Sequence, residues 1–122
     1  MTKTILVVED EKYMREVLVA KLVKEGFTVI EALDGSEALD MTAKKKPDLV
    51  VLDIILPIMN GFDYLEAKAK VAGVAAIPVI ILSNLGQRED VERGMKLGAK
   101  DYLIKAHFTP NDLIAKVHTH IG

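Results

Sequence analysis

The stretch LVVLD at residues 49–53 decides the fold of this chain. Its four apolar residues are too few for a helix, its valines favour a strand, and it ends on an acid, Asp53. A second run of the same kind, ILVVED at residues 5–10, ends on Glu9 and Asp10. Both runs are typical of buried strands in a parallel sheet, with acidic side chains placed where each strand ends.

Three further apolar runs complete a set of five expected strands: residues 27–32, 78–83 and 101–104. The intervening segments have helical spacing, start signals or stop signals, and they predict helices at residues 13–24, from Asp34 to the lysines at 44–46, from 61 through Val71, at 87–97, and from Pro110 after a Thr109 cap. This alternation predicts a doubly wound, flavodoxin-like α/β fold, with five flanking helices and a five-stranded parallel sheet in the order 2-1-3-4-5. Right-handed crossovers then bring all the carboxyl ends of the strands to one edge, where such sheets bind ligands.

Size and composition restrict the classes of function. The 122 residues suit one domain spanning 1–122, and 50% hydrophobic residues exclude a disordered chain. Sixteen Lys and Arg residues against eighteen Asp and Glu residues leave a net charge of −2, which argues against direct nucleic-acid binding. The absence of cysteine excludes disulfides and thiolate sites and fits the cytoplasm. No apolar run is long enough for membrane insertion or for a signal peptide.

The expected topology gathers five polar residues at one sheet edge: Glu9, Asp10, Asp53, Ser83 and Lys105. Three carboxylates placed together repel one another and raise each other's pKa unless a cation lies among them. An all-oxygen set of ligands suits Mg²⁺, which shares its coordination shell with water and phosphate oxygens. Lys105 adds a compact positive charge suited to a phosphoryl group.

On these residues the whole chain resembles the receiver domain of bacterial-type response regulators. The resemblance rests on Glu9-Asp10, on the pattern D-x-x-L-P-x-x-N-G at residues 53–61, on Ser83 and on Lys105. It implies that Asp53 is a phosphoacceptor assisted by Lys105 and Ser83. It also implies that Mg²⁺ is bound by Glu9, Asp10, Asp53 and the backbone carbonyl of Ile55.

The resemblance further implies a signalling switch that assists its own phosphorylation and dephosphorylation and turns over no metabolite. A sensor histidine kinase or phosphotransfer protein would supply the phosphoryl group. Ser83 and Tyr102 would then alter the surface made by the fourth helix, fifth strand and fifth helix, which contacts a downstream protein or output domain and through which members of the family can form homodimers. Ile55 and Leu85 match positions that tune dephosphorylation, and both are apolar here. We therefore expect a long-lived phosphoryl group.

One departure from the family pattern leaves an alternative open. The family usually has proline after the lysine, often with a cis peptide bond, whereas this chain has Lys105-Ala106. Because a non-proline cis bond costs roughly 3 kcal/mol, the loop must either retain strain or take a trans path, and this choice leaves the position of Lys105 open. The alternative is a receiver-like interaction module that works without phosphorylation.

Two other functions lack their sequence signals. A nucleotide-binding site would need glycines after the first strand, and an aspartyl phosphohydrolase would resemble D-x-D where this chain has Asp53-Ile54-Ile55. His107, His118 and His120 are interpreted as surface residues rather than zinc ligands.

Overall fold

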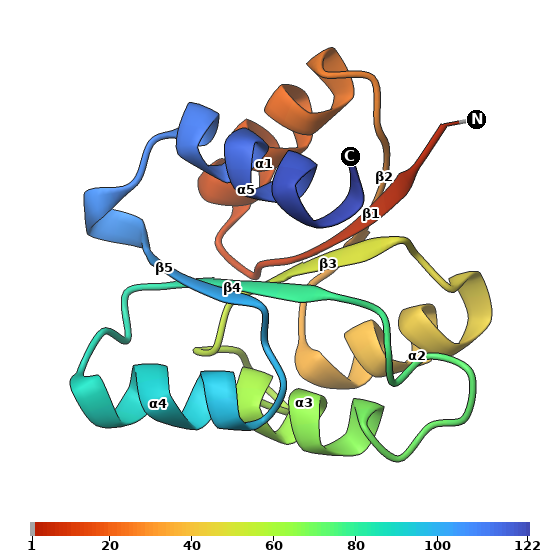
Figure 1. Cartoon of the computed structure of the whole chain (residues 1–122), viewed down its shortest axis with the longest axis vertical. Coiled ribbons are helices and arrows are strands. Elements are labelled where there is room, and N and C mark those ends of the chain that lie inside the picture. Colours follow the sequence, from red (N-terminus) through yellow and green to blue (C-terminus); the bar gives the residue numbers. More distant parts are fainter. Residues whose placement is uncertain (1) are drawn as a thin grey trace.

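Strands and helices alternate along the chain from the first strand to the last helix (Figure 1). The computed structural model describes residues 2–122. The strands are β1 (Thr4–Val8), β2 (Thr28–Ala32), β3 (Leu49–Leu52), β4 (Val79–Ser83) and β5 (Asp101–Ile104). The helices are α1 (Lys12–Lys24), α2 (Gly35–Lys45), α3 (Gly61–Lys68), α4 (Arg88–Lys96) and α5 (Pro110–Ile121), and a short 3₁₀ turn, η1 (Lys105–His107), follows β5.

The five strands form one parallel sheet in the order β2-β1-β3-β4-β5, which confirms the predicted topology. The register of the sheet positions the polar residues beyond it. Val8 of β1 pairs with Leu52 of β3, so the residues that follow them emerge side by side. Ser83 pairs with Ile104, which brings the start of η1 to the same edge. The strand ends therefore converge as the alternation of strands and helices predicts.

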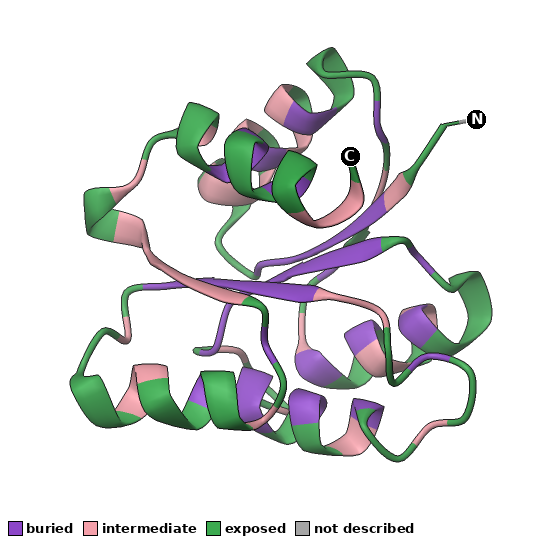
Figure 2. Cartoon of the chain, in the orientation of Figure 1, coloured by how far each residue is buried: buried purple, intermediate pink, exposed green. Residues whose placement is uncertain are grey.

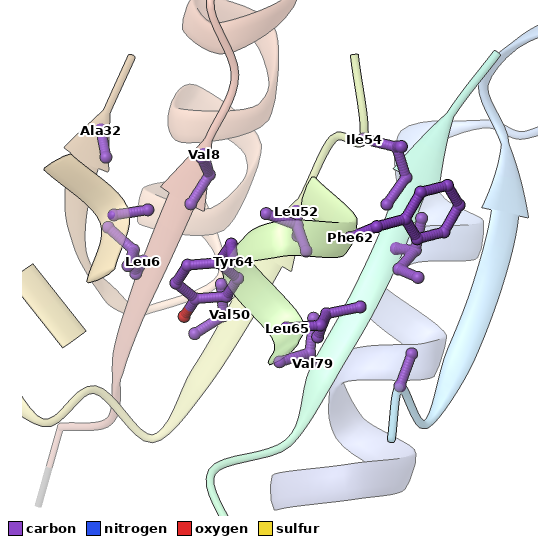
Figure 3. Close-up of a cluster of buried hydrophobic side chains, with 13 residues drawn as sticks. Leu6, Val8, Ala32, Val50, Leu52, Ile54, Phe62, Tyr64, Leu65 and Val79 are labelled. Carbon is purple, nitrogen blue, oxygen red and sulfur yellow. The ribbon is translucent and has the colours of Figure 1, made fainter. Parts of the chain in front are cut away.

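Helices cover both faces of the sheet, with α1 and α5 on one face and α2, α3 and α4 on the other (Figure 1). Burial is greatest in the three central strands, whereas every residue of the edge strand β5 is only partly buried (Figure 2). The sheet separates two apolar cores. One packs α1 and α5 on the sheet through Leu18, Leu22, Leu113, Ile114 and Val117. The other, seen in Figure 3, packs α3 through Phe62, Tyr64 and Leu65.

Local sequence signals account for the starts of α2 and α5. The side chain of Asp34 accepts a hydrogen bond from the backbone N–H of Glu37 and caps α2, which begins where predicted. The side chain of Thr109 accepts one from the backbone N–H of Asp112, so the predicted Thr109 cap is confirmed. Pro110 occupies the first turn of α5, where a missing N–H costs nothing.

The predicted end of α3 at Val71 is wrong, because the helix ends at Lys68. Beyond that residue the backbone hydrogen bonding departs from the α-helical pattern. The N–H of Val71 donates to the carbonyl of Lys68, only three residues earlier rather than four. Gly73, with φ +87°, takes the chain out of the helical path. The buried Lys68 ammonium donates to the carbonyl of Ala75 at 2.9 Å and so stabilises the loop rather than a further helical turn.

No cis peptide bond occurs within residues 2–122, so the Lys105–Ala106 bond takes the trans form. Over the same range, every helix is too short or too polar to cross a membrane.

Candidate functional site

The three acids predicted to meet do so at the carboxyl edge of the sheet. One carboxylate oxygen from each of Glu9, Asp10 and Asp53 lies within 4.8 Å of the others. Glu9 and Asp53 are only 2% and 6% exposed, whereas Asp10 is exposed. Glu9 and Asp53 thus form the buried part of the site, and Asp10 lies on its solvent-exposed side, from which a cation can enter.

Lys105 joins these acids from the far end of the chain. Its ammonium nitrogen lies 2.7 Å from Oδ2 of Asp53 and 2.5 Å from Oε1 of Glu9, and its side chain is only 11% exposed. The trans path through η1 therefore lets Lys105 reach Asp53, and no proline is needed to place it. Its ammonium group is the cation that permits two buried carboxylates to lie together.

Burial and direct contacts together shift the pKa values of Glu9 and Lys105. Burial raises the pKa of Glu9, and Asp53 adds to the rise, although hydrogen bonds from Lys105 and from the N–H of Glu11 oppose it. Burial also disfavours the charged form of Lys105, but bonds to Asp53 and Glu9 outweigh this cost and raise its pKa. Lys105 therefore stays protonated near neutral pH and can neutralise an incoming phosphoryl group.

Backbone donors fix the two buried carboxylates. The N–H of Ile55 donates to Oδ1 of Asp53 at 3.2 Å, and the N–H of Glu11 donates to Oε2 of Glu9 at 3.1 Å. Gly61, the last residue of the motif at 53–61, lets the chain pass close to the acid. A Cβ at Gly61 would lie 2.6 Å from the backbone oxygen of Asp53.

Ser83 and Tyr102 meet through the backbone of Leu85. The buried Oγ of Ser83 accepts a hydrogen bond from the N–H of Leu85 at 3.2 Å, and the hydroxyl of Tyr102 donates to the carbonyl of the same residue. Burial, with the charges of Asp90 and Asp53, raises the pKa of Tyr102 to about 12, so the phenol stays a donor. Gly94 of α4 lies against the tyrosine ring, where a Cβ would meet a ring carbon at 3.0 Å.

Ile55 and Leu85, the two apolar residues expected to tune dephosphorylation, have different surroundings. Ile55 is 59% exposed beside Asp53. Leu85 is half-buried and packs against the core cluster under α3. Neither side chain carries a group that could orient a water molecule.

His120 is not a simple surface residue. Its Nε2 lies 2.6 Å from Oδ2 of Asp101 and links the last turn of α5 to the start of β5, and its side chain is 21% exposed. The sequence offered no signal for this pair, because the two residues meet only once α5 packs beside the edge strand. His107 and His118 are exposed, as predicted.

The arrangement combines two buried carboxylates, one exposed carboxylate and an ammonium group. The cluster offers only oxygen ligands and no thiolate or imidazole, which fits Mg²⁺. Such a site can bind a divalent cation and hold an anionic phosphoryl group next to a carboxylate nucleophile.

Comparison with known proteins agrees with this geometry. The family model described as "Response regulator receiver domain" matches residues 5–118. The phosphate regulon transcriptional regulatory protein PhoB of Klebsiella pneumoniae is 38% identical over 117 residues, which cover 96% of this chain and 51% of that protein. The probable transcriptional regulator ycf27 of Cyanophora paradoxa is also 38% identical, over 96% of this chain and 47% of that protein.

Solved structures are similar over nearly the whole chain. The receiver domain of the sensor histidine kinase PA1611 from Pseudomonas aeruginosa PAO1, solved with a magnesium ion coordinated in its active site cleft, has a TM-score of 0.91 at 26% identity. The similarity covers 100% of this chain and 99% of that one. The chain spans about half the length of the curated relatives it matches. By the family match, the fold and the identity to these relatives, the chain belongs to the response regulator receiver domains of two-component signalling systems.

Proposed function

We propose that Asp53 of this receiver domain accepts a phosphoryl group from a phosphohistidine donor in a magnesium-dependent reaction. The observation that carries the proposal is the buried Asp53 carboxylate held at 2.7 Å by Lys105 within a cluster of three acids. A buried aspartate at a metal-binding edge with one lysine is arranged to accept a phosphoryl group rather than to maintain the fold.

The transfer step makes one bond and breaks one. A carboxylate oxygen of Asp53 attacks the phosphorus, the P–N bond of the donor breaks, and its electron pair returns to the histidine nitrogen. The product is an acyl phosphate. Lys105 stays within reach of the transferred group because its ammonium already contacts Oδ2 of Asp53. The Ile55 N–H fixes the other oxygen and so orients the nucleophile.

Glu9, Asp10, Asp53 and the backbone carbonyl of Ile55 are the proposed magnesium ligands. The carboxylates fit the ion in type, and one oxygen from each lies within 4.8 Å of the others. A bound magnesium ion would neutralise charge on the phosphoryl oxygens and on the acids. The relative from Pseudomonas aeruginosa, with a magnesium ion in its cleft, supports this assignment.

Ser83 and Tyr102 are proposed to pass the signal to the surface formed by α4, β5 and α5. The Oγ of Ser83 accepts a bond from Leu85, which leaves its own proton free for a phosphoryl oxygen. Movement of Ser83 would shift the Leu85 backbone, to whose carbonyl Tyr102 donates. A phosphoryl group would thus bias a two-state equilibrium at this surface.

The proposed partners are a sensor histidine kinase or phosphotransfer protein upstream and a protein or output domain downstream. Relatives named as transcriptional regulators favour gene regulation as the output. Homodimer formation through the same surface is part of the proposal. This unit itself would not bind nucleic acid, because its net charge is −2.

The test is the intact mass after incubation with acetyl phosphate, with and without Mg²⁺, for the wild type and for Asp53→Asn. We expect one magnesium-dependent, hydroxylamine-labile phosphoryl adduct that is absent from the variant. A folded wild type that binds Mg²⁺ but gains no adduct would refute phosphorylation and favour the phosphorylation-independent interaction module.

A further inference from the structure

Arg15 of α1 holds the loop that carries two of the three acids. This loop, residues 9–11, connects β1 to α1. Nη1 of Arg15 donates to the backbone carbonyl of Glu9 at 3.0 Å and lies 3.4 Å from that of Asp10. On its other side, Nε of Arg15 lies 3.2 Å from Oε1 of Glu31 in β2. The guanidinium thus bridges the acidic loop and the neighbouring strand.

The two acids of the loop depend on Arg15 to different degrees. The Glu9 carboxylate has its own anchors, the ammonium of Lys105 and the N–H of Glu11. Within residues 2–122, no hydrogen bond or ion pair to the Asp10 carboxylate is found. The position of Asp10 therefore depends on the backbone that carries it, and Arg15 contacts that backbone at its carbonyl.

We propose that Arg15 is a positioning residue that keeps Asp10 in the geometry that binds Mg²⁺, and that Glu31 in turn orients Arg15. This inference rests on the proposed magnesium site. Groups that orient metal ligands are typically worth roughly 10–100-fold in metal affinity. Arginine suits the role because its planar fork presents donors in two directions, whereas the single ammonium of lysine cannot reproduce both contacts.

Because Arg15 is positively charged, the direction in which its loss changes the Mg²⁺ affinity tests the proposal. A positive group near a cation site repels Mg²⁺, so loss of the charge alone would strengthen metal binding. Loss of the loop contacts would instead weaken it. Arg15→Gln therefore gives opposite results under the two explanations. Arg15→Lys keeps the charge and loses the fork, so a purely electrostatic role predicts wild-type affinity.

The measurement is the dissociation constant of MgCl₂ by isothermal titration calorimetry on metal-free protein. The variants are Arg15→Gln, Arg15→Lys and, as the matched control, Arg88→Gln. Arg88 pairs with Glu92 on α4 with 88% of its side chain exposed, so its loss changes the net charge equally without touching the loop. We expect both Arg15 variants to bind Mg²⁺ roughly tenfold more weakly and Arg88→Gln to bind like the wild type. Thermal unfolding of each metal-free variant measures any change in stability separately.

Three results would overturn the proposal. Unchanged or tighter Mg²⁺ binding in both Arg15 variants, beside a wild type that binds, would show that Arg15 does not position the site. A lower melting temperature with unchanged Mg²⁺ affinity would assign Arg15 a structural role alone. A folded wild type that binds no Mg²⁺ would instead refute the magnesium site itself, and the inference with it.

Discussion

Replacing Ile58 with glycine is expected to stabilise the protein, although it removes a large apolar side chain. Ile58 lies on the loop between β3 and α3 with φ 67°, in the left-handed region that β-branched residues strongly disfavour. Its side chain is 85% exposed, so its truncation loses almost no packing. The residue thus carries backbone strain without the burial that would offset it.

The magnitude follows from two opposing terms. A left-handed backbone costs a non-glycine residue about 1–2 kcal/mol. Glycine removes that strain but loses roughly 0.5–1 kcal/mol through the greater freedom of its unfolded chain. The net expectation is a gain of about 0.5–1 kcal/mol in unfolding free energy, which corresponds to a rise of roughly 2–4 °C in melting temperature for a domain of this size.

The assay is urea and thermal unfolding followed by far-UV circular dichroism in the absence of Mg²⁺. Two control variants separate the causes. Ile58→Ala keeps a β-carbon and should recover only part of the gain, whereas Ile55→Gly, at an exposed position without a positive φ, should destabilise. A melting temperature for Ile58→Gly at or below that of the wild type, with an unchanged denaturant slope, would refute the strain argument.

Three further predictions concern the site and the core. Leu85→Gln should hydrolyse the Asp53 acyl phosphate several-fold faster than the wild type, because an amide can orient water; a decay no faster than wild type, followed by intact mass, would contradict this. In metal-free protein the pKa of Glu9 is raised, which favours the protonated carboxyl. Protonated Glu9 therefore stabilises the folded state below pH 4.5, and this contribution to the free energy of unfolding is lost as the pH rises through the raised pKa. Unfolding curves of Glu9→Gln should lack this loss, and parallel pH profiles for the two proteins would be evidence against it. Thr42→Val should destabilise by about 1–3 kcal/mol because it leaves the buried Tyr64 hydroxyl, 2.7 Å from Thr42 Oγ1, without its partner. Tyr64→Phe should cost less, since the threonine still bonds a carbonyl one turn earlier, and denaturant melts in the reverse order would refute this reasoning.

The fold and the cluster of acids could be predicted because the signals that determine them are local. An apolar run such as residues 49–52 has a strand's length and composition, and the acid that follows it must lie at the sheet edge. The side-by-side placement of Glu9 and Asp53 then follows from topology and parallel pairing.

The features that sequence could not provide depend on distant contacts. The end of α3 at Lys68 is associated with a hydrogen bond to Ala75, which no helix signal encodes. The reach of Lys105 depends on the path of η1 and on the register of β5. The contacts of Arg15 and the pair between His120 and Asp101 arise only when separate elements pack together. Lys68, Arg15 and His120 look like ordinary surface residues in the sequence until the tertiary structure supplies their partners.

The partial burial of β5 has a consequence for how the site can be lost. Lys105 directly follows this edge strand, every residue of which is only partly buried. Amide hydrogens of such a strand are expected to exchange through local opening well below the free energy of global unfolding. Each opening would withdraw the ammonium while Glu9 and Asp53 stay in place just beyond the ends of the central strands β1 and β3. Hydrogen-exchange protection of β5 should therefore be higher while the two carboxylates are ionised and bonded to Lys105, and lower when they are protonated. The edge strand would then report the charge state of the site.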